Sequence, residues 1–187
     1  MCLIQIGSGS ANLDANIQDG FTNYIISKNI KKKIFIIEAN SIHINHLKKF
    51  YEKNKNVKIL NLAIIPDDID LEMMDFFYCL EDFPNYQIFS NSKSFVRKHF
   101  PNGKIKKTSV ECTKISDFFD KNNIDKIDYL SIDIEGMDYS VLINLDLKKI
   151  KIENISFEHL HLTLWQKIKI VYKFINNGFF FQVWVLI

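Results

Sequence analysis

Residues 128–136 read Asp128-Tyr129-Leu130-Ser131-Ile132-Asp133-Ile134-Glu135-Gly136. The apolar residues of this stretch predict a buried strand over Ile127–Ile134. Alternate side chains of an extended chain share a face, so Ser131, Asp133 and Glu135 are expected on one side of it. Two carboxylates at the end of a buried strand repel each other and are costly unless they are paired, protonated or bound to a metal. Such a pair is typical of a functional site.

The rest of the chain alternates short apolar runs with segments of helical period. Strands are predicted at Leu3–Ile6, Lys33–Glu38, Val57–Ile64, Ile127–Ile134, Ile155–Phe157 and Phe179–Leu186. Helices are predicted at Ile17–Asn29, Ile42–Lys53, Asp138–Leu145 and Thr163–Asn176. This alternation is typical of an α/β fold with a doubly wound, mostly parallel sheet. The length of 187 residues predicts one domain over 1–187.

Two of the helices carry expectations about caps and buried faces. Ser41 is expected to cap the helix at 42–53, whose inward residues are Ile44, Leu47 and Tyr51. The helix at 163–176 is expected to have two distinct faces. Its predicted inward residues are Leu164, Ile168, Val171 and Ile175, and its predicted outward residues are Lys167, Lys169 and Lys173.

Residues at about 66–119 interrupt the alternation with β-like pieces at 70–78 and 106–113 around 91–100. An insertion between the third and fourth strands lies near the carboxyl ends, where doubly wound sheets bind ligands. We therefore interpret it as an elaboration of the substrate side. Its aromatic residues could stack on a sugar or pack the insertion onto the sheet. They are Phe76, Phe77, Tyr78, Phe83, Tyr86 and Phe89.

The ends of the first three strands together predict a nucleoside site. The first strand is followed by the turn Gly7-Ser8-Gly9-Ser10, where glycines let the backbone bend sharply and approach a ligand. The second ends in Glu38, which can accept hydrogen bonds from both hydroxyls of a ribose. The third ends in Asn61-Leu62-Ala63, where a base edge would lie. Each feature alone is common, whereas their order and spacing indicate a nucleoside.

A dinucleotide is the competing ligand of this turn. Its fingerprint has a third glycine three residues after the second, and Asn12 stands there instead. The pyrophosphate of NAD needs that close helix start, while a ligand without phosphate does not. S-adenosylmethionine is such a ligand, so an NAD-dependent oxidoreductase is the less favoured alternative.

The fifth strand ends in another acidic residue, Glu158, followed by His159. Neighbouring strands lie about 4.8 Å apart, so these residues are expected close to Asp133 and Glu135 if the two strands pair. The structural alternative is a helix-capping cluster, in which Glu135, Gly136 and Asp138 serve the N-terminus of the following helix.

Five stretches resemble the FkbM-type S-adenosylmethionine-dependent methyltransferases. They are Ile4-Gln5-Ile6-Gly7, Ile37-Glu38-Ala39-Asn40, Asn61-Leu62-Ala63-Ile64, residues 129–142 and Ile155-Ser156-Phe157-Glu158-His159. The resemblance implies a class I methyltransferase (Rossmann-like) fold and methyl transfer, typically to oxygen, with family members acting on sugars and natural products. The chain ends at Ile187 directly after its last apolar strand, so we expect the final antiparallel strand of that fold to be lacking.

The resemblance and the motifs together give a list of candidate site residues. The cofactor-binding candidates are Gly7, Ser8, Gly9, Glu38, Ala39, Asn61, Ala63 and Asp133, and the catalytic candidates are Asp133, Glu135, Glu158 and His159. The expected reaction is methyl transfer to a hydroxyl oxygen of a sugar or small metabolite, with Asp133, or Glu158 with His159, as the base. The same oxygen-rich set could hold a divalent metal, with candidates Asp133, Glu158 and His159. A catalytically inactive nucleoside-binding module of the same fold is the alternative.

The composition of the chain limits the classes of binding partner that we expect. Hydrophobic residues make up 47% and charged residues 25%, as in a globular protein with a core. The net charge is +2 and Arg97 is the one arginine, so we expect no nucleic-acid partner. The three cysteines form no disulfide or zinc pattern, and no apolar run approaches the length of about 20 residues that spans a bilayer. We expect a cytoplasmic protein with a small-molecule or glycan acceptor and no membrane partner, and a second copy could cover the apolar segment at 179–187.

Overall fold

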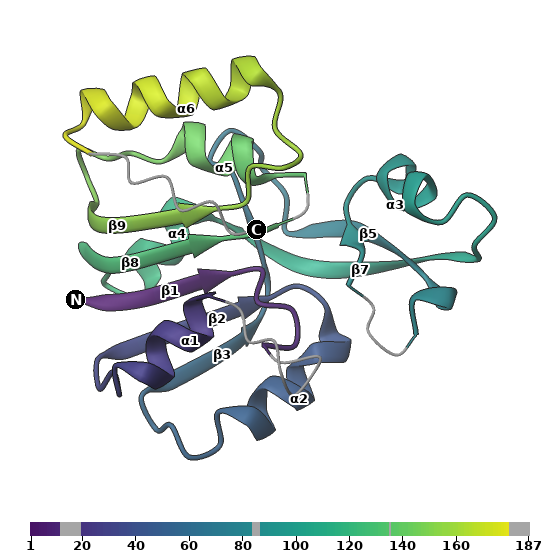
Figure 1. The fold of residues 1–187 in the computed structure, drawn as a ribbon, viewed down its shortest axis with the longest axis horizontal. Coiled ribbons are helices and arrows are strands. Elements are labelled where there is room, and N and C mark those ends of the chain that lie inside the picture. Colours follow the sequence, from purple (N-terminus) through teal and green to yellow (C-terminus); the bar gives the residue numbers. More distant parts are fainter. Residues whose placement is uncertain (12–19, 84–86, 135, 180–187) are drawn as a thin grey trace.

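The computed structural model describes residues 1–11, 20–83, 87–134 and 136–179. Its centre is a five-stranded sheet in the order β3-β2-β1-β8-β9, in which every neighbouring pair is parallel (Figure 1). The strands are β1 (Cys2–Ile6), β2 (Lys33–Glu38), β3 (Val57–Asn61), β8 (Lys126–Ile132) and β9 (Lys151–Phe157). The order reverses between β1 and β8, which is where doubly wound sheets open a crevice for ligands. The predicted α/β fold with a parallel sheet is confirmed.

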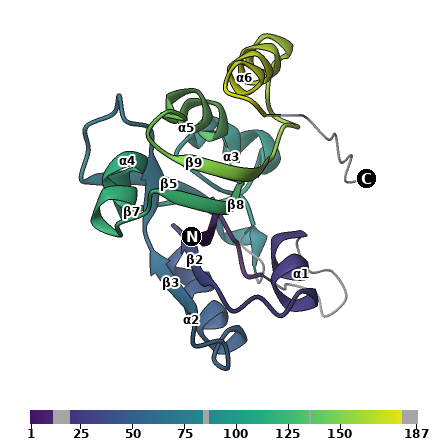
Figure 2. The same ribbon diagram turned by 90° about the vertical axis from the view of Figure 1, so that its left-hand side faces the viewer.

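Helices cover both faces of this sheet. One face carries α1 (Gly20–Ser27) and α2 (Ser41–Phe50), and the other carries α4 (Ile115–Lys121), α5 (Asp138–Asn144) and α6 (Leu164–Asn176). Figure 2 shows α1 and α4 on opposite sides of the strands. The side chains of β2 alternate accordingly: Ile34 and Ile36 pack with α1 and α2, while Phe35 and Ile37 pack with α4. All four are fully buried, so the central strands are apolar throughout.

A second sheet projects from the edge at which the parallel strands end (Figure 1). Its order is β4-β7-β5-β6, formed by β4 (Ala63–Ile65), β5 (Met73–Cys79), β6 (Phe89–Ser90) and β7 (Ile105–Lys114). The 3-10 helix η1 (Leu80–Asp82) and the helix α3 (Lys93–His99) accompany it. Its core includes Met137, which belongs to the connection after β8. The second sheet is therefore packed against the segment that follows Asp133.

The predicted third strand, Val57–Ile64, is wrong in its extent. The strand is broken at Leu62, so that β3 pairs with β2 while β4 pairs with β7 in the other sheet. At the break, the Leu62 backbone N–H donates to the carbonyl of Glu38 over 3.2 Å. The partner of β4 lies about 50 residues further along the chain, so no local pattern indicated the switch.

In the same sheet, Phe76 and Phe89 stack at 4.9 Å and are part of its core.

The cap of α2 is Asn40, and the expectation for Ser41 was wrong by one residue. The Asn40 side chain accepts a hydrogen bond from the Ile42 backbone N–H over 3.2 Å. Asparagine and serine cap helices about equally well, so the sequence did not separate the two. The predicted inward residues Ile44 and Leu47 are buried, as is Tyr51.

The predicted inward face of α6 is wrong. Ile170 and Phe174 are fully buried, whereas Leu164, Ile168, Val171 and Ile175 are exposed. Lys173, expected to point outward, donates to the carbonyl oxygens of Ile143 at 2.6 Å and Leu145 at 2.5 Å. These carbonyls lie at the C-terminus of α5, where the last turn of a helix leaves acceptors without an intrahelical donor. That interaction holds the lysine side of α6 close to α5.

Two substitutions test the orientation of α6. Ile170→Ala is expected to lower the free energy of unfolding by about 2–4 kcal/mol, because it opens a cavity in the core. Ile168→Ala is the matched control and is expected to change it by less than about 0.5 kcal/mol, since its side chain is 47% exposed. Urea unfolding of both variants measures the difference. A larger loss for Ile168→Ala than for Ile170→Ala would restore the face expected from the hydrophobic pattern.

Several expectations fall on residues outside the described part of the chain. The start of the helix predicted at Ile17–Asn29, most of the strand predicted at Phe179–Leu186 and the lacking final strand are among them. Within the described residues, no helix combines the length and the apolar character that crossing a membrane requires.

Candidate functional site

The turn after β1 is built against Asp133. Gly7 has a φ of +77°, and its backbone N–H donates to the carbonyl of Ile37 over 2.9 Å. A Cβ atom at Gly7 would lie 1.6 Å from the carbonyl oxygen of Asp133, so no other residue fits there. The Asp133 backbone N–H in turn donates to the carbonyl of Ile6 over 2.9 Å. The end of β1 and the end of β8 are thus in direct backbone contact.

Gly9 differs from Gly7 in what surrounds it. Its φ of +54° also lies in the left-handed region, but a Cβ atom there would meet no described atom within 4 Å. Next to it Ser8 is buried, with its hydroxyl donating to the Gly9 carbonyl at 3.3 Å and its own carbonyl accepting from Ala11 at 3.2 Å. The turn is therefore tight on its inner side and open beside Gly9.

Glu38 ties this turn to the end of β2. Its Oε2 accepts the backbone N–H of Gly9 at 2.7 Å and its Oε1 accepts that of Asn40 at 2.6 Å. Burial raises the pKa of Glu38 from 4.5 to about 7, opposed by these backbone donors and assisted by the nearby charge of Asp133. The Ser8 backbone N–H is a third donor to this carboxylate. The two oxygens together offer about four acceptor positions, so one remains for a hydroxyl group.

The other cofactor candidates lie beside Glu38. The side-chain amide of Asn61 donates to the carbonyls of Glu38 at 2.8 Å and Ala39 at 2.9 Å, so that its donor group holds the backbone in place. Ala63 is buried in the core of the second sheet, against which Ala39 also packs. Asn61 thus binds the backbone at the end of β2, and the contact of these three residues with a cofactor stays a prediction.

The acidic pair at the ends of the strands consists of Asp133 and Glu158. β8 ends at Ile132, so Asp133 follows the strand, contrary to the expected strand over 127–134. The Glu158 backbone N–H donates to the carbonyl of Ile132 over 3.1 Å, which sets the two acids side by side. Asp133 keeps an exposed surface, yet the surrounding protein and then the charges of Glu158 and Asp138 raise its pKa well above the usual range. The charge of Glu158 thus disfavours the ionised form of Asp133.

Two of the neighbouring acids have different outcomes. Glu135 lies outside the described residues, so its assignment stays a prediction. Asp138 is buried and accepts the backbone N–H groups of Ile134 at 3.0 Å and Gly136 at 3.4 Å. These contacts fix the connection between β8 and α5 rather than cap the helix, whose N-cap residue Met137 makes no side-chain capping bond.

The histidine beside Glu158 is His161. Both His159 and His161 are exposed, and His161 Nε2 lies 3.6 Å from Glu158 Oε1, within ion-pair distance. The His161 ring meets Phe95 of α3 edge-on, with centroids 5.2 Å apart, and His99 at 6.4 Å. Sequence reasoning missed these residues of α3 because they come from an insertion some 60 residues earlier. The spacing of three residues between Glu158 and His161, closed by a turn, was the one available signal.

No metal centre emerges from the candidates. Among the residues that the structure describes, no group of three or more histidine, cysteine, aspartate or glutamate side chains is arranged to hold a metal ion. The metal candidates Asp133, Glu158 and His159 are therefore not carried into the proposals below.

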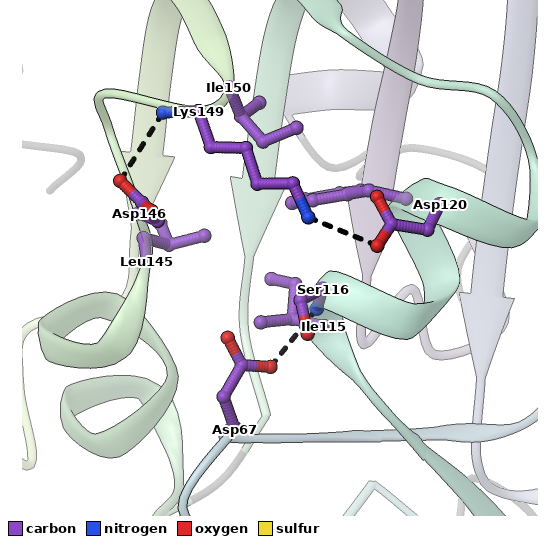
Figure 3. Close-up of a pocket in the computed structure, with 9 residues that line it drawn as sticks. Asp67, Ile115, Ser116, Asp120, Leu145, Asp146, Lys149 and Ile150 are labelled. Atoms are coloured by element: carbon purple, nitrogen blue, oxygen red, sulfur yellow. Dashed lines mark hydrogen bonds and ion pairs between the residues drawn. The ribbon is translucent and has the colours of Figure 1, made fainter.

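A small pocket lies apart from these residues (Figure 3). It is lined by Asp67, Ile115, Ser116, Phe119, Asp120, Leu145, Asp146, Lys149 and Ile150, between α4 and the connection from α5 to β9. Lys149 Nζ pairs with Asp120 at 3.0 Å, and Asp67 accepts the Ser116 backbone N–H at 3.1 Å. Because its polar groups bind one another and none is a predicted site residue, we interpret this pocket as structural.

Comparisons with known proteins agree with the resemblance. The parallel sheet with helices on both faces defines a doubly wound α/β domain, and a family model described as "Methyltransferase FkbM domain" matches residues 12–181. The chain belongs to the FkbM methyltransferase family. No curated protein matches it. A solved structure, precorrin-6y C5,15-methyltransferase from Geobacter metallireducens GS-15, is similar with 15% identity and a TM-score of 0.43, over 95% of this chain and 63% of that one. The chain thus spans less than two thirds of that protein's length.

Proposed function

We propose that this chain binds S-adenosylmethionine and transfers its methyl group to a hydroxyl oxygen of a sugar or small metabolite. The observation that carries the proposal is the meeting of the Gly7 turn, the Glu38 carboxylate and Asp133 at one edge of the sheet. Membership of a methyltransferase family supports it. The proposed partner is a small-molecule or glycan acceptor, and neither a nucleic acid nor a membrane is required.

The residues of the crevice fit the nucleoside part of this cofactor. Glu38 keeps an acceptor position beside its three backbone donors, which suits a hydroxyl group of a ribose. The open side of Gly9 leaves room for a ligand against the backbone of the turn. When bound, S-adenosylmethionine supplies a methyl group activated by a positively charged sulfur. A cationic ligand there would also be favoured by the ionised forms of Glu38 and Asp133, whose pKa values it would lower.

The acidic pair is proposed to lie on the acceptor side. Glu158 and Asp133 can accept hydrogen bonds from acceptor hydroxyls and so orient one of them toward the methyl group. Glu135 is proposed with them on sequence grounds alone. A positioned proton acceptor contributes about 10²–10⁴-fold to such a reaction.

Replacing Asp133 by asparagine tests this arrangement. Asp133→Asn is expected to leave the affinity for S-adenosylhomocysteine within about tenfold and to lower methyl transfer by about 100-fold. Calorimetric titration measures the first quantity, and radiolabelled methyl transfer to a panel of glycosides measures the second. Asp120→Asn, in the exposed ion pair with Lys149, is the matched control and should change neither.

The outcomes separate the parts of the proposal. A wild-type chain that fails to bind S-adenosylhomocysteine contradicts the proposed function. Binding without transfer to any hydroxyl acceptor would favour an inactive nucleoside-binding module. Full transfer by Asp133→Asn would remove Asp133 from the acceptor side.

A further inference from the structure

Three contacts connect the end of β8 with the inserted helix α3. Asp133 and Glu158 interact through their carboxyl groups, Glu158 Oε1 lies 3.6 Å from His161 Nε2, and the His161 ring meets Phe95 edge-on. Asp133 itself touches Gly7, beside which the cofactor is proposed to bind. These contacts therefore extend from the turn at which the cofactor is proposed to bind to the inserted segment. His161 lies at the end of this series that is farther from the turn.

The surroundings of His161 favour one arrangement of its ring. A carboxylate facing Nε2 stabilises the tautomer that carries its hydrogen there, and the other nitrogen, Nδ1, is then the basic one. The edge of Phe95 restrains the plane of the ring. Phe95 is itself held at the start of α3, where its backbone N–H donates to Ser92 Oγ over 3.2 Å. A base oriented by a carboxylate is a recurring catalytic arrangement.

We propose that His161 is the proton acceptor for the hydroxyl group that is methylated, and that Glu158 is its positioning residue. This inference rests on the proposed function. The hydroxyl O–H bond breaks and its proton passes to His161 Nδ1, while the oxygen forms a bond to the methyl carbon. The carbon–sulfur bond breaks in the same step, and its electron pair stays on sulfur. The imidazolium then releases the proton to solvent, so one proton is released for each methyl group transferred.

The tautomer of His161 tests the assignment without any acceptor. In ¹⁵N-labelled protein at pH 8, long-range ¹H–¹⁵N correlation spectra are expected to show His161 with its hydrogen on Nε2. The Glu158→Ala variant should give a mixture of tautomers, like that of the exposed His159, which serves as the internal control. A hydrogen on Nδ1 in the wild-type protein would overturn the proposal, as would a spectrum that Glu158→Ala leaves unchanged.

Transfer assays test the chemistry, with p-nitrophenyl glycosides as the acceptor probes. His161→Ala is expected to lower kcat by about 100-fold or more and to leave S-adenosylhomocysteine binding within about twofold. Added imidazole should restore at least a tenth of the lost kcat, a rescue that a purely structural role would not allow. His46→Ala, at an exposed position of α2, is the matched control and should stay within about twofold of the wild type.

The two hypotheses fail in different ways. Absence of S-adenosylhomocysteine binding or of transfer in the wild-type chain contradicts the proposed function itself. A wild type that binds and transfers, together with a His161→Ala variant that keeps its kcat or an imidazole addition without effect, contradicts only the role of His161.

Discussion

Gly7→Ala is expected to destabilise the chain by about 4 kcal/mol or more, a large part of the roughly 5–15 kcal/mol by which single domains are stable. The new Cβ atom would lie 1.6 Å from the carbonyl oxygen of Asp133 and 2.6 Å from its carbonyl carbon. Backbone atoms in two paired strands cannot move aside without breaking the bond between Asp133 and Ile6. The φ of +77° adds a conformational cost of about 1–2 kcal/mol for any residue with a Cβ. Urea unfolding followed by circular dichroism measures the loss.

Gly9→Ala separates the steric clash from the backbone conformation. Gly9 also has a positive φ, but no described atom lies within 4 Å of the position of its Cβ. It should therefore lose only the conformational term, about 1 kcal/mol. If the two variants lost equal free energy of unfolding, Gly7 would not be in close contact with the backbone of Asp133. The arrangement of the two strand ends would then differ from the one described.

The arrangement of the strand ends around Gly7, Glu38 and Asp133 could be predicted from the sequence more completely than the second sheet could. β1, β2 and β8 are largely apolar, and each ends at a glycine turn or an acid, so Gly7, Glu38 and Asp133 could be placed at one edge. The doubly wound topology then brings those ends together without any further information. Local signals were sufficient because each of these residues follows directly from its own strand.

The features that were missed depend on partners distant in the sequence. β4 leaves the parallel sheet because β7 pairs with it, and His161 meets Phe95 because the inserted segment folds back over the end of the sheet. The outward apolar face of α6 has the same origin, since Lys173 binds carbonyl groups at the end of another helix. Periodicity describes one element at a time and contains none of these contacts.

The affinity for S-adenosylhomocysteine is expected to rise about tenfold between pH 6 and pH 8 through the ionisation of Glu38. Ribose hydroxyls donate to the carboxylate, so they favour its charged form and lower its pKa from about 7 in the free protein. Below pH 7, binding must therefore release a proton, and each further pH unit weakens binding by up to about tenfold. Calorimetric titrations in buffers of different ionisation enthalpy count that proton directly. We expect nearly one proton released per ligand at pH 6 and almost none at pH 8.

Two variants assign this dependence to Glu38. Glu38→Gln should lower the affinity at pH 8 by about 100-fold and abolish the pH dependence, because an amide has one acceptor atom and does not ionise in this range. Asp133 has a raised pKa as well, so Asp133→Asn is the control and should keep the dependence. An unchanged pH profile in Glu38→Gln would place the titrating group elsewhere.

The same ionisation affects folding in the opposite direction. Between about pH 4.5 and pH 7 the native chain keeps a proton on Glu38 that the unfolded chain has already released, so the free energy of unfolding falls as the pH rises. The change in pKa corresponds to about 3 kcal/mol of stability by pH 8. The buried carboxylate is thus destabilising in the empty protein and becomes favourable when hydroxyl groups bind to it. Ligand binding should therefore raise the unfolding temperature more at pH 8 than at pH 6, which differential scanning calorimetry would measure.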